Sequence, residues 1–557
     1  MLTESTVEVR YEGTLHRVEA GTRVEEFLQG VDGEIPDTVL AALVNRRQVM
    51  LDFPLRGRAE LELVRYGSRS AELVYKRSVS LMLYEACMEL FPEAQLVIGQ
   101  SLGNCYHYEV RGEHPSFEDM ARALEERMQE LHREARPFVR ETVTIEEVED
   151  FFREQGCEDK LALLSTRRSS MVHTIRCGQF VDLAHSPFAP HTGCLPTFAV
   201  KAYGDGILLR FPRRSNRDRL PPFKDRPTLY ATYVETRTWQ DLLGVRHVGD
   251  LNRLALNGEI KDFIHISEGL HEKKIAAIAD EIAARMGEGL RLVTIAGPSS
   301  SGKTTFAKRL GIQLRVAGIE PVGLSLDDYY VDRDRTPRDE EGKLDFENIE
   351  AIDLDLFHEQ LAELLEGREV LTPRYDFVTG TRKPKEKWKA LRLEEGQILV
   401  IEGIHGLNPR LTENVPANRK FRIFASALTQ LAIDNHNRIF TSDARLIRRI
   451  VRDRFFRGFT AERTLELWER VRRGEGRWIF PFQEEADVMF NSALVYEPAV
   501  LRTYAERFLL QVPRTSHAYP EAYRLLKGLS LFVPIFPDEV PQTSILREFI
   551  GGSAFHY

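Results

Sequence analysis

The chain has 557 residues, of which 43% are hydrophobic and 29% are charged, and its formal net charge is −9. This length predicts several domains, and the composition is typical of folded proteins rather than of disordered chains. The acidic balance argues against a protein whose overall charge holds nucleic acid, because such binding depends on neutralising phosphates. The sequence shows no signal peptide, no membrane span and only five cysteines, without a C-x-x-C pair. These features predict a soluble cytoplasmic protein.

Residues 1–65 have the patterning of a small β-rich unit. Thr22 is expected to cap a short helix that carries Val24, Phe27 and Leu28. Alternating or apolar runs predict strands on either side of this helix, at Thr6–Val9, Leu15–Val18, Ala41–Val44, Gln48–Leu51 and Ala59–Val64. Strands wrapped on one helix favour a β-grasp fold.

The middle of the chain is expected to be an α+β unit at residues 66–235, followed by a helical connector at residues 236–287. Long charged helices are predicted at Phe117–Arg136 and Thr144–Gln155. From Leu290 onwards the pattern changes to apolar strand, glycine loop, helix and strand, which indicates a parallel sheet. The fold class is therefore multidomain, with α+β units followed by an α/β unit at residues 288–500.

A phosphate-binding loop follows the apolar strand Leu290–Ala296. The motif G-x-x-x-x-G-K-T lies in the strand–loop–helix context that it needs to cradle phosphate oxygens with backbone N–H groups. Lys303 is expected to reach the β- and γ-phosphates of ATP, and Thr304 to hold Mg²⁺. The predicted ATP-binding loop comprises Gly297, Pro298, Ser299, Ser300, Ser301, Gly302, Lys303, Thr304 and Thr305.

Acidic residues end two further apolar strands of this unit. Glu402 closes the strand Ile398–Ile401 and is the expected second metal ligand. Asp327 and Asp328 follow Val322–Leu326, where open α/β sheets bind their ligands. One of the two could accept the proton of an attacking hydroxyl group, although either could instead cap the following helix.

An arginine-rich segment lies at Asn437–Arg477, with 12 Arg, no Lys and 6 acidic residues. The spacing i, i+3, i+4, i+7 puts Arg445, Arg448, Arg449 and Arg452 on one helix face. Arginine suits a bidentate grip on phosphate oxygens, so we expect a mobile lid over the transferred phosphate. The alternative is a solvated face stabilised by i,i+4 pairs such as Arg449 with Asp453.

Residues 288–500 resemble the uridine kinase/phosphoribulokinase branch of P-loop kinases. Six motifs match in order: Gly297–Thr305, Ser325–Tyr330, Asp345–Glu347, Tyr375–Phe377 with Arg382, Ile401–Gly403, and Asp443–Leu446 with its following arginines. The resemblance implies ATP and Mg²⁺ as cofactors, and Asp327, Lys303 and Arg449 as catalytic residues. It also assigns Arg445, Arg448 and Arg452 to ATP, Thr304 and Glu402 to the metal, and the acceptor to Asp328, Tyr330, Glu347, Tyr375, Phe377 and Arg382.

The acceptor predicted from this resemblance is a nucleoside, phosphorylated at its ribose 5′-hydroxyl, or another small polyol. Two departures leave the base specificity open. Gly380 stands where animal-type uridine kinases have a pyrimidine-reading His, and Glu347 replaces their ribose-binding Asp. A phosphoribulokinase-like sugar kinase is one alternative. Another is a translation-linked RNA-binding or regulatory ATPase.

The N-terminal half resembles parts of threonyl-tRNA synthetases. Residues 1–65 look like a TGS domain, and residues 66–235 are similar to the second additional domain, through Arg77–Ala94, Leu96–Gly99 and Phe180–Gly193. In the synthetase domain, two His on one helix join a later Cys and a later His to form the editing site. In this sequence the two helix positions are Arg77 and Leu81, and the later positions are Ala184 and Phe188. We therefore expect no editing and no metal there, while a tRNA-related ligand stays possible.

Three residue groups remain outside these motifs. His185 and His191 are expected to be surface or packing residues. The cysteines are expected in hydrophobic cores. Residues 501–557 are predicted to be helical and then rich in proline, and to pack on the kinase-like unit or to form a dimer contact.

Overall fold

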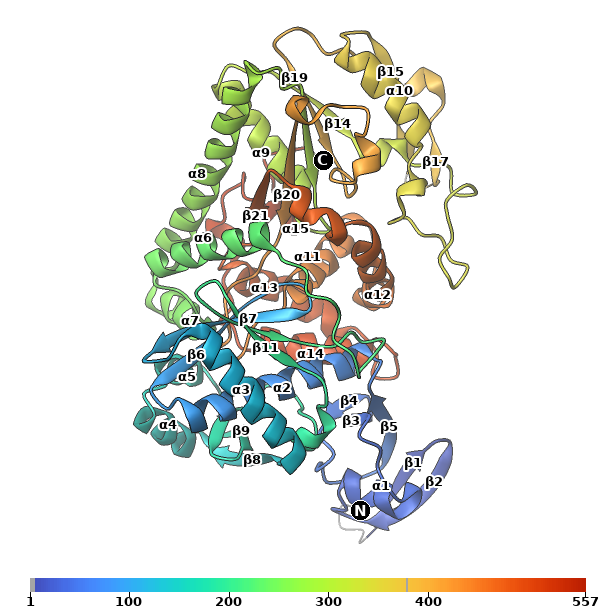
Figure 1. Ribbon diagram of the computed structural model, residues 1–557. Helices are drawn as coiled ribbons and strands as arrows, with labels where there is room; N and C mark the ends of the chain where they lie inside the picture. The colour runs from blue at the N-terminus through green and yellow to red at the C-terminus, as the bar shows by residue number, and fades with distance from the viewer. Residues whose placement is uncertain (1–5, 377–378, 557) are drawn as a thin grey trace.

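The computed structural model describes residues 6–376 and 379–556. Figure 1 shows three units stacked along one axis, with the N-terminal unit at the bottom of the view and the parallel sheet in the upper part. In the part of the chain that the structure describes, no helix is both long and apolar enough to span a membrane.

The N-terminal unit is a β-grasp, as predicted. Its sheet has the order β2-β1-β5-β3-β4, in which β1 and β5 run parallel and the other neighbours run antiparallel. The elements are β1 (Thr6–Tyr11), β2 (Thr14–Glu19), α1 (Val24–Asp32), β3 (Val39–Val44), β4 (Arg47–Val49) and β5 (Ala59–Arg65). Val24, Phe27 and Leu28 are buried under the sheet. The predicted cap is off by one residue, because Arg23 caps α1 and the Thr22 hydroxyl donates to the carbonyl of Glu19.

The α+β unit contains two antiparallel sheets, β10-β9-β8 and β11-β12-β7-β6. Its helices are α2 (Arg69–Leu90), α3 (Phe117–Glu134), α4 (Ile145–Glu154) and α5 (Glu158–Leu164). Its strands are β6 (Ala94–Ser101), β7 (Cys105–Gly112), β8 (Phe138–Thr144), β9 (Met171–Cys177), β10 (Phe180–Leu183), β11 (Ala199–Tyr203) and β12 (Gly206–Arg210). α2 is buried on all sides from Ser78 to Cys87, whereas α3 packs one face, with Leu124, Met128 and Leu131, into the core that it shares with α2 and the strands.

Three helices link this unit to the parallel sheet: α6 (Pro227–Leu243), α7 (Val248–Asn257) and α8 (Ile260–Met286). α6 begins with Pro227 at its first turn and ends at Gly244, whose φ of 64° is the left-handed conformation that favours glycine. The helix therefore runs across the boundary that the sequence suggested at residue 235.

The third unit is built on a parallel sheet with the order β14-β19-β13-β20-β21. Its strands are β13 (Leu292–Ala296), β14 (Pro321–Ser325), β19 (Ile398–Glu402), β20 (Lys420–Ser426) and β21 (Val488–Asn491). The helices around it are α9 (Lys303–Val316), α10 (Leu354–Leu365), α11 (Thr441–Phe456), α12 (Ala461–Trp478), α13 (Glu497–Leu510), α14 (Tyr519–Leu529) and α15 (Arg547–Ile550). Two short strand pairs lie outside this sheet: β15 (Val370–Thr372) with β18 (Lys389–Leu391), and β16 (Tyr375–Asp376) with β17 (Thr381–Arg382).

Residues 501–557 pack on this third unit. Leu501, Leu525 and Phe549 share one hydrophobic core with Leu446 and Ile450 of α11. The other end of the chain reaches the same helices, because Arg46 lies 3.2 Å from His517 between side-chain nitrogens and Arg47 lies over the ring of Tyr523. The first and last segments of the chain are therefore in contact.

A buried charge cluster joins the α+β unit to the third unit. Lys160 Nζ lies 2.6 Å from Asp182 Oδ1 and 3.3 Å from Asp434 Oδ1, and all three residues are at most 3% exposed. The lysine holds the pKa of Asp434 well below its usual value, against the opposing effect of burial. The two carboxylates could not both stay charged without this cation.

Replacing Lys160 by Met is expected to destabilise the protein by about 3–5 kcal/mol, because two buried carboxylates lose their shared cation. The free energy of unfolding from urea titration measures this change. The control is Lys273→Met at an exposed side chain of α8, which should change the value by less than about 0.5 kcal/mol. Equal effects of the two variants would show that the cluster contributes little.

Candidate active site

The phosphate loop connects β13 to α9, as predicted. Its tight course depends on two glycines: a Cβ on Gly297 would lie 1.9 Å from the carbonyl oxygen of Ala425, and Gly302 has φ of +80°. Ser300 also has a positive φ, 59°, without being glycine. A loop of this shape turns successive N–H groups towards one point, which creates an anion-binding concavity at the N-terminus of α9.

Three strand ends bring the predicted catalytic groups to the same edge of the sheet. β13 leads into Lys303, β14 into Asp327 through the 3₁₀ turn Leu326–Tyr329, and β19 ends at Glu402. The register aligns Glu402 with Ile295 on one side and with Ser325 on the other, and the Ser325 hydroxyl donates to Glu402 Oε1 at 3.3 Å. Lys303 Nζ lies 3.3 Å from the carbonyl oxygen of Pro298.

The electrostatics of this edge fit a divalent cation. The pKa of Glu402 is raised to about 7: burial and then the neighbouring Asp327 raise it, and Lys303 opposes both effects. Burial likewise raises the pKa of Asp327, again against Lys303. Two carboxylates that resist ionisation together are stabilised by Mg²⁺, which prefers oxygen ligands. Glu402 and the hydroxyl of Thr304, in the first turn of α9, are the residues that would hold the ion.

On the acceptor side, Tyr330 and Tyr375 form a small buried cluster with ring centroids 5.7 Å apart. Asp328 accepts a hydrogen bond from the backbone N–H of Tyr375 at 3.1 Å, so it positions this segment. Arg382 is also used structurally: its guanidinium donates to the carbonyls of Tyr329 and Tyr330, and to Asp353. The predicted substrate contact Phe377 lies outside the described residues.

Glu347 lies against α12, where Gly474 leaves room for it. A Cβ on Gly474 would come within 2.3 Å of the Cβ of Glu347. The pKa of Glu347 is raised to about 7: burial and then Glu475 raise it, and Arg449 and Lys303 oppose this rise. Glu347 Oε2 has no hydrogen-bond partner among the described residues, so this oxygen is available to a ligand.

The raised pKa of Glu347 predicts a pH-dependent penalty. The folded state binds a proton that the unfolded state has already released between about pH 4.5 and pH 7, so Glu347 lowers stability as the pH rises through this window. Glu347→Gln should therefore raise the unfolding midpoint relative to the wild type at pH 8, and should change it much less at pH 4.5. Thermal unfolding at both pH values measures the difference. An identical shift at both would contradict the assignment.

The arginines of α11 contact the phosphate loop, but most of them are paired with carboxylates. Arg445 donates to the carbonyl of Ser299 and forms a buried ion pair with Glu475. Arg448 pairs with Glu497 and donates to the carbonyl of Ser492. These two arginines are 1% and 0% exposed.

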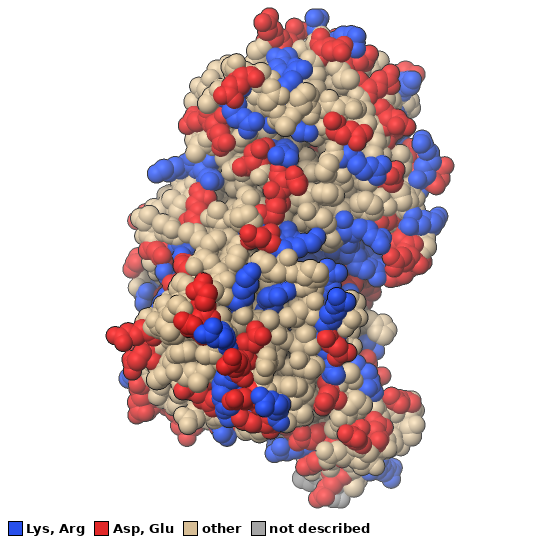
Figure 2. Space-filling view, viewed as in Figure 1, with Lys and Arg blue, Asp and Glu red and all other residues tan. Residues whose placement is uncertain are grey.

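Arg449 and Arg452 of α11 pair with a carboxylate of the same helix, rather than with one of another helix. Arg449 donates to Ser299 Oγ at 2.8 Å and lies 3.3 Å from Asp453, so the alternative i,i+4 pair is present together with a loop contact. Arg452 also pairs with Asp453. Figure 2 shows Lys and Arg side chains gathered where Figure 1 places α12, beside this helix.

The mobile lid expected from the arginine spacing is instead a packed helix in this structure. Leu446, Ile450 and Val451 belong to the main hydrophobic core, whereas Phe456 at the end of α11 is 58% exposed. The arginine spacing correctly placed the four side chains on one face. It could not show that carboxylates of α12 and α13 approach that face.

Two glutamates that the sequence analysis did not single out contact the phosphate loop. Glu475 Oε1 accepts from the backbone N–H of Ser299 at 3.1 Å. Glu548 Oε2 accepts from the N–H and the hydroxyl of Thr305, at 3.2 and 2.6 Å. Ile545 covers Gly302, since a Cβ there would lie 2.4 Å from its Cγ2. The C-terminal segment therefore places a carboxylate where the loop offers anion-binding groups.

Comparisons with known proteins agree with both halves of this description. Residues 292–496 match the model of the Phosphoribulokinase / Uridine kinase family. The matched segment contains the phosphate loop, and the match supports phosphotransfer to an alcohol group in general. The N-terminal region matches threonine–tRNA ligases.

Three of these ligases show the extent of the match. The protein of Desulforamulus reducens is 30% identical over 185 residues, which cover 33% of this chain and 29% of that protein. The protein of Rubrobacter xylanophilus is 33% identical, over 33% of this chain and 29% of that protein. The protein of Halorhodospira halophila is 28% identical, over 46% of this chain and 39% of that protein. The chain thus spans less than half the length of these curated relatives.

Solved kinase structures also align with the chain. A putative fructose transport system kinase from Silicibacter sp. has 17% identity and a TM-score of 0.28, and covers 39% of this chain and 98% of its own. A possible uridine kinase from Bacillus stearothermophilus has 19% identity and a TM-score of 0.26. The alignment covers 38% of this chain and 96% of that kinase. These scores are too low to add to the argument.

In the α+β unit, the four positions that differ from the synthetase pattern come together. Arg77, Leu81, Ala184 and Phe188 all line one cavity. His185 lies in the same cavity and approaches Asp434 at 3.2 Å. The other histidine, His191, instead lies 3.6 Å from the sulfur of Cys194, with Asp37 close by.

Proposed function

We propose that the chain is an ATP-dependent kinase that transfers the γ-phosphate to the 5′-hydroxyl of a nucleoside. The observation that carries this proposal is the convergence of Lys303, Asp327 and Glu402 at the carboxyl edge of the parallel sheet. Tyr330, Tyr375 and the open oxygen of Glu347 lie on the acceptor side, and suit a ring and a ribose hydroxyl. The partner is a small molecule, and the cytoplasmic location stays a prediction.

In this reaction Asp327 accepts the proton of the acceptor hydroxyl as the oxygen attacks the γ-phosphorus, and ADP leaves with the electrons of the broken P–O bond. Lys303 neutralises the charge that develops on the phosphate oxygens. Thr304 and Glu402 would hold Mg²⁺, which would supply positive charge to offset that of the phosphates. Arg449, already at the loop, is placed to contribute a further positive charge.

A coupled assay of ADP release over nucleosides, pentoses and phosphorylated sugars tests this function. A nucleoside acceptor that raises ADP release well above background hydrolysis supports the proposal. Preference for a phosphorylated pentulose would favour the sugar kinase alternative. If no acceptor exceeds background, the chain is not a kinase of small alcohols.

The similarity to threonine–tRNA ligases supports a second candidate, a translation-linked RNA-binding or regulatory ATPase. Its measurable signature is the salt dependence of tRNA binding, because phosphate contacts release counterions. A steep dependence with sub-micromolar affinity at moderate salt would favour this candidate. Weak binding at all salt concentrations would exclude it.

The contact between Glu548 and Thr305 leads to an expectation about ATP. A carboxylate at these donors competes with a phosphate, so Glu548→Ala should lower the dissociation constant for ATP by about tenfold, given the worth of a charge-assisted hydrogen bond. Calorimetric titration with ATP and Mg²⁺ measures the change. The matched control is Glu539→Ala, which removes only a surface pair with Lys261. Weaker ATP binding in Glu548→Ala would show that the carboxylate helps to shape the site instead.

A further inference from the structure

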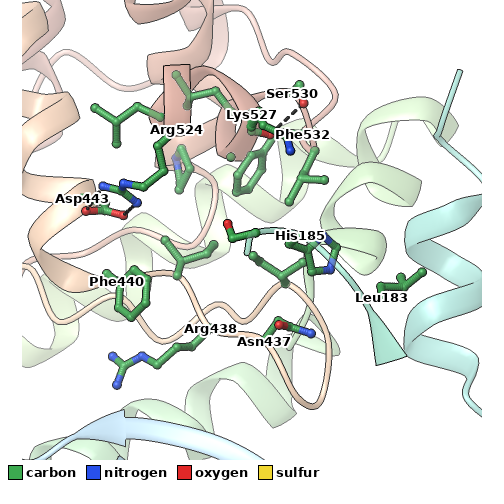
Figure 3. Close-up of a pocket in the computed structure, with 18 of the residues that line it drawn as sticks. Leu183, His185, Asn437, Arg438, Phe440, Asp443, Arg524, Lys527, Ser530 and Phe532 are labelled. Atoms are coloured by element: carbon green, nitrogen blue, oxygen red, sulfur yellow. Dashed lines mark hydrogen bonds and ion pairs between the residues drawn. The ribbon is translucent and has the colours of Figure 1, made fainter. Parts of the chain in front are cut away.

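A cavity of about 990 Å³ lies away from the phosphate loop, at the junction of the α+β unit, the start of α11 and α14. This volume is at the upper end of the range of about 300–1,000 Å³ found for small-molecule sites. Figure 3 shows Arg524 and Lys527 of α14 on one side, Leu183 and His185 of the α+β unit on the other, and Asn437 to Phe440 below. Two halves of the chain thus contribute walls to one space.

The acidic groups of the cavity wall are already neutralised. Asp182 pairs with Lys160, Asp443 with Arg524, and Glu497 with Arg448. These are the three carboxylates among the described lining residues. None of them is free to balance another positive charge.

Several cations of the wall, by contrast, have no carboxylate partner. Arg77, Arg167, Arg168 and Lys527 line the cavity, and none forms an ion pair with any described residue. The guanidinium of Arg77 donates to the carbonyl of Pro187 at 2.7 Å, which restrains its orientation. The wall therefore carries four cations that form no ion pair with a carboxylate of the described chain.

The titration behaviour of this wall agrees with the geometry. Burial lowers the pKa of Lys527, and Arg140, Arg167, Arg77 and Arg47 lower it further. Burial and Arg524 lower the pKa of Arg77 to about 10. Cations that lower each other's pKa are stabilised by an anion placed among them.

We propose that this cavity binds a small phosphorylated molecule, whose phosphate is held by Arg77, Arg167 and Lys527. Phosphate is favoured over a single carboxylate because it carries up to two charges and offers several oxygens to two guanidinium forks and one ammonium. The volume of the cavity falls in the range of small-molecule sites, which favours a small molecule over a polymer. The site is separate from the phosphate loop, so the inference does not depend on the proposed kinase activity.

Pyrophosphate is the probe for the test, in calorimetric titrations of the full chain that carries Lys303→Ala to weaken the phosphate loop. Binding should persist in this background, and Arg167→Gln with Lys527→Gln should weaken it at least tenfold. Lys273→Gln, which removes an exposed lysine of α8, is the matched control and should leave the affinity unchanged. Arg168→Gln, at an exposed loop position, is a second variant that should weaken binding by a smaller factor.

Three results would overturn the proposal. One is loss of pyrophosphate binding with Lys303→Ala alone, which would assign all binding to the loop. Another is an unchanged affinity for pyrophosphate in the double variant Arg167→Gln, Lys527→Gln, when its unfolding midpoint shows that the protein is folded as before. The third is that a single-stranded RNA oligomer binds through these cations and that pyrophosphate fails to displace the RNA. This result would identify a polymer surface instead.

Discussion

Asp327→Asn is expected to lower kcat by about 10²–10⁴-fold, the range over which positioned general bases contribute to catalysis. The amide keeps the size of the side chain but cannot accept the proton of the acceptor hydroxyl. Because Asp327 follows β14 and has Lys303 and Arg457 as its cationic neighbours, its loss should leave the phosphate loop in place. Steady-state kinetics with the acceptor found in the ADP-release assay should show the change in kcat, with KM for ATP altered by less than about threefold.

The control for this variant is Asp355→Asn at an exposed position in the first turn of α10. It removes a carboxylate of the same unit that does not face the site, so kcat should stay within about twofold of the wild type. A kcat of Asp327→Asn close to that of this control would assign the base role to another group. Asp328 would then be the next candidate, although its carboxylate already accepts from Tyr375.

Lys303→Ala is expected to have the second large effect, a loss of about 10²–10³-fold in kcat, because a fixed cation no longer stabilises the phosphate charge of the transition state. It should also weaken ATP binding, in contrast to Asp327→Asn. Lys303 lowers the pKa of Asp327, Glu402 and Glu347 in the structure, so its removal makes all three carboxyls harder to ionise. Kinetics and ATP titration on the same preparation separate the two contributions.

Lys303→Arg provides the comparison for this variant. Arginine keeps the charge but carries it on a larger planar group, so it should restore ATP binding in part and kcat only weakly. A chain with Lys303→Ala that retains wild-type kcat would show that the loop lysine is not at the transferred phosphate. The ATP site would then have a structural or regulatory role.

The parts of the site that the sequence predicted are those fixed by local geometry. The phosphate loop needs glycine at Gly297 and Gly302 for steric reasons that operate within a few residues. Asp327 and Glu402 were predictable because parallel strands end at the same edge of a sheet. The β-grasp unit was predictable for a similar reason, since its strands alternate and its turns are short, as at Asn45 and Arg46, both with positive φ.

The parts that the sequence did not predict depend on contacts between distant segments. Glu548 is 243 positions from Thr305, and Glu475 is 176 positions from Ser299. Neither glutamate belongs to a motif whose spacing could indicate such a contact. The same reason explains why the partners of the α11 arginines were not predicted. Helical spacing places these arginines on one face, but tertiary packing decides whether phosphates or carboxylates contact that face.

The contact between the β3–β4 hairpin and the region of α14 also has a consequence for synthesis on the ribosome. Arg46 and Arg47 are synthesised long before His517 and Tyr523, which they contact. The β-grasp core can form early because its pairings are local, but its docking must wait until α14 has been made. A nascent chain arrested before residue 517 should therefore carry a folded N-terminal unit that has not yet found its place on the rest of the protein.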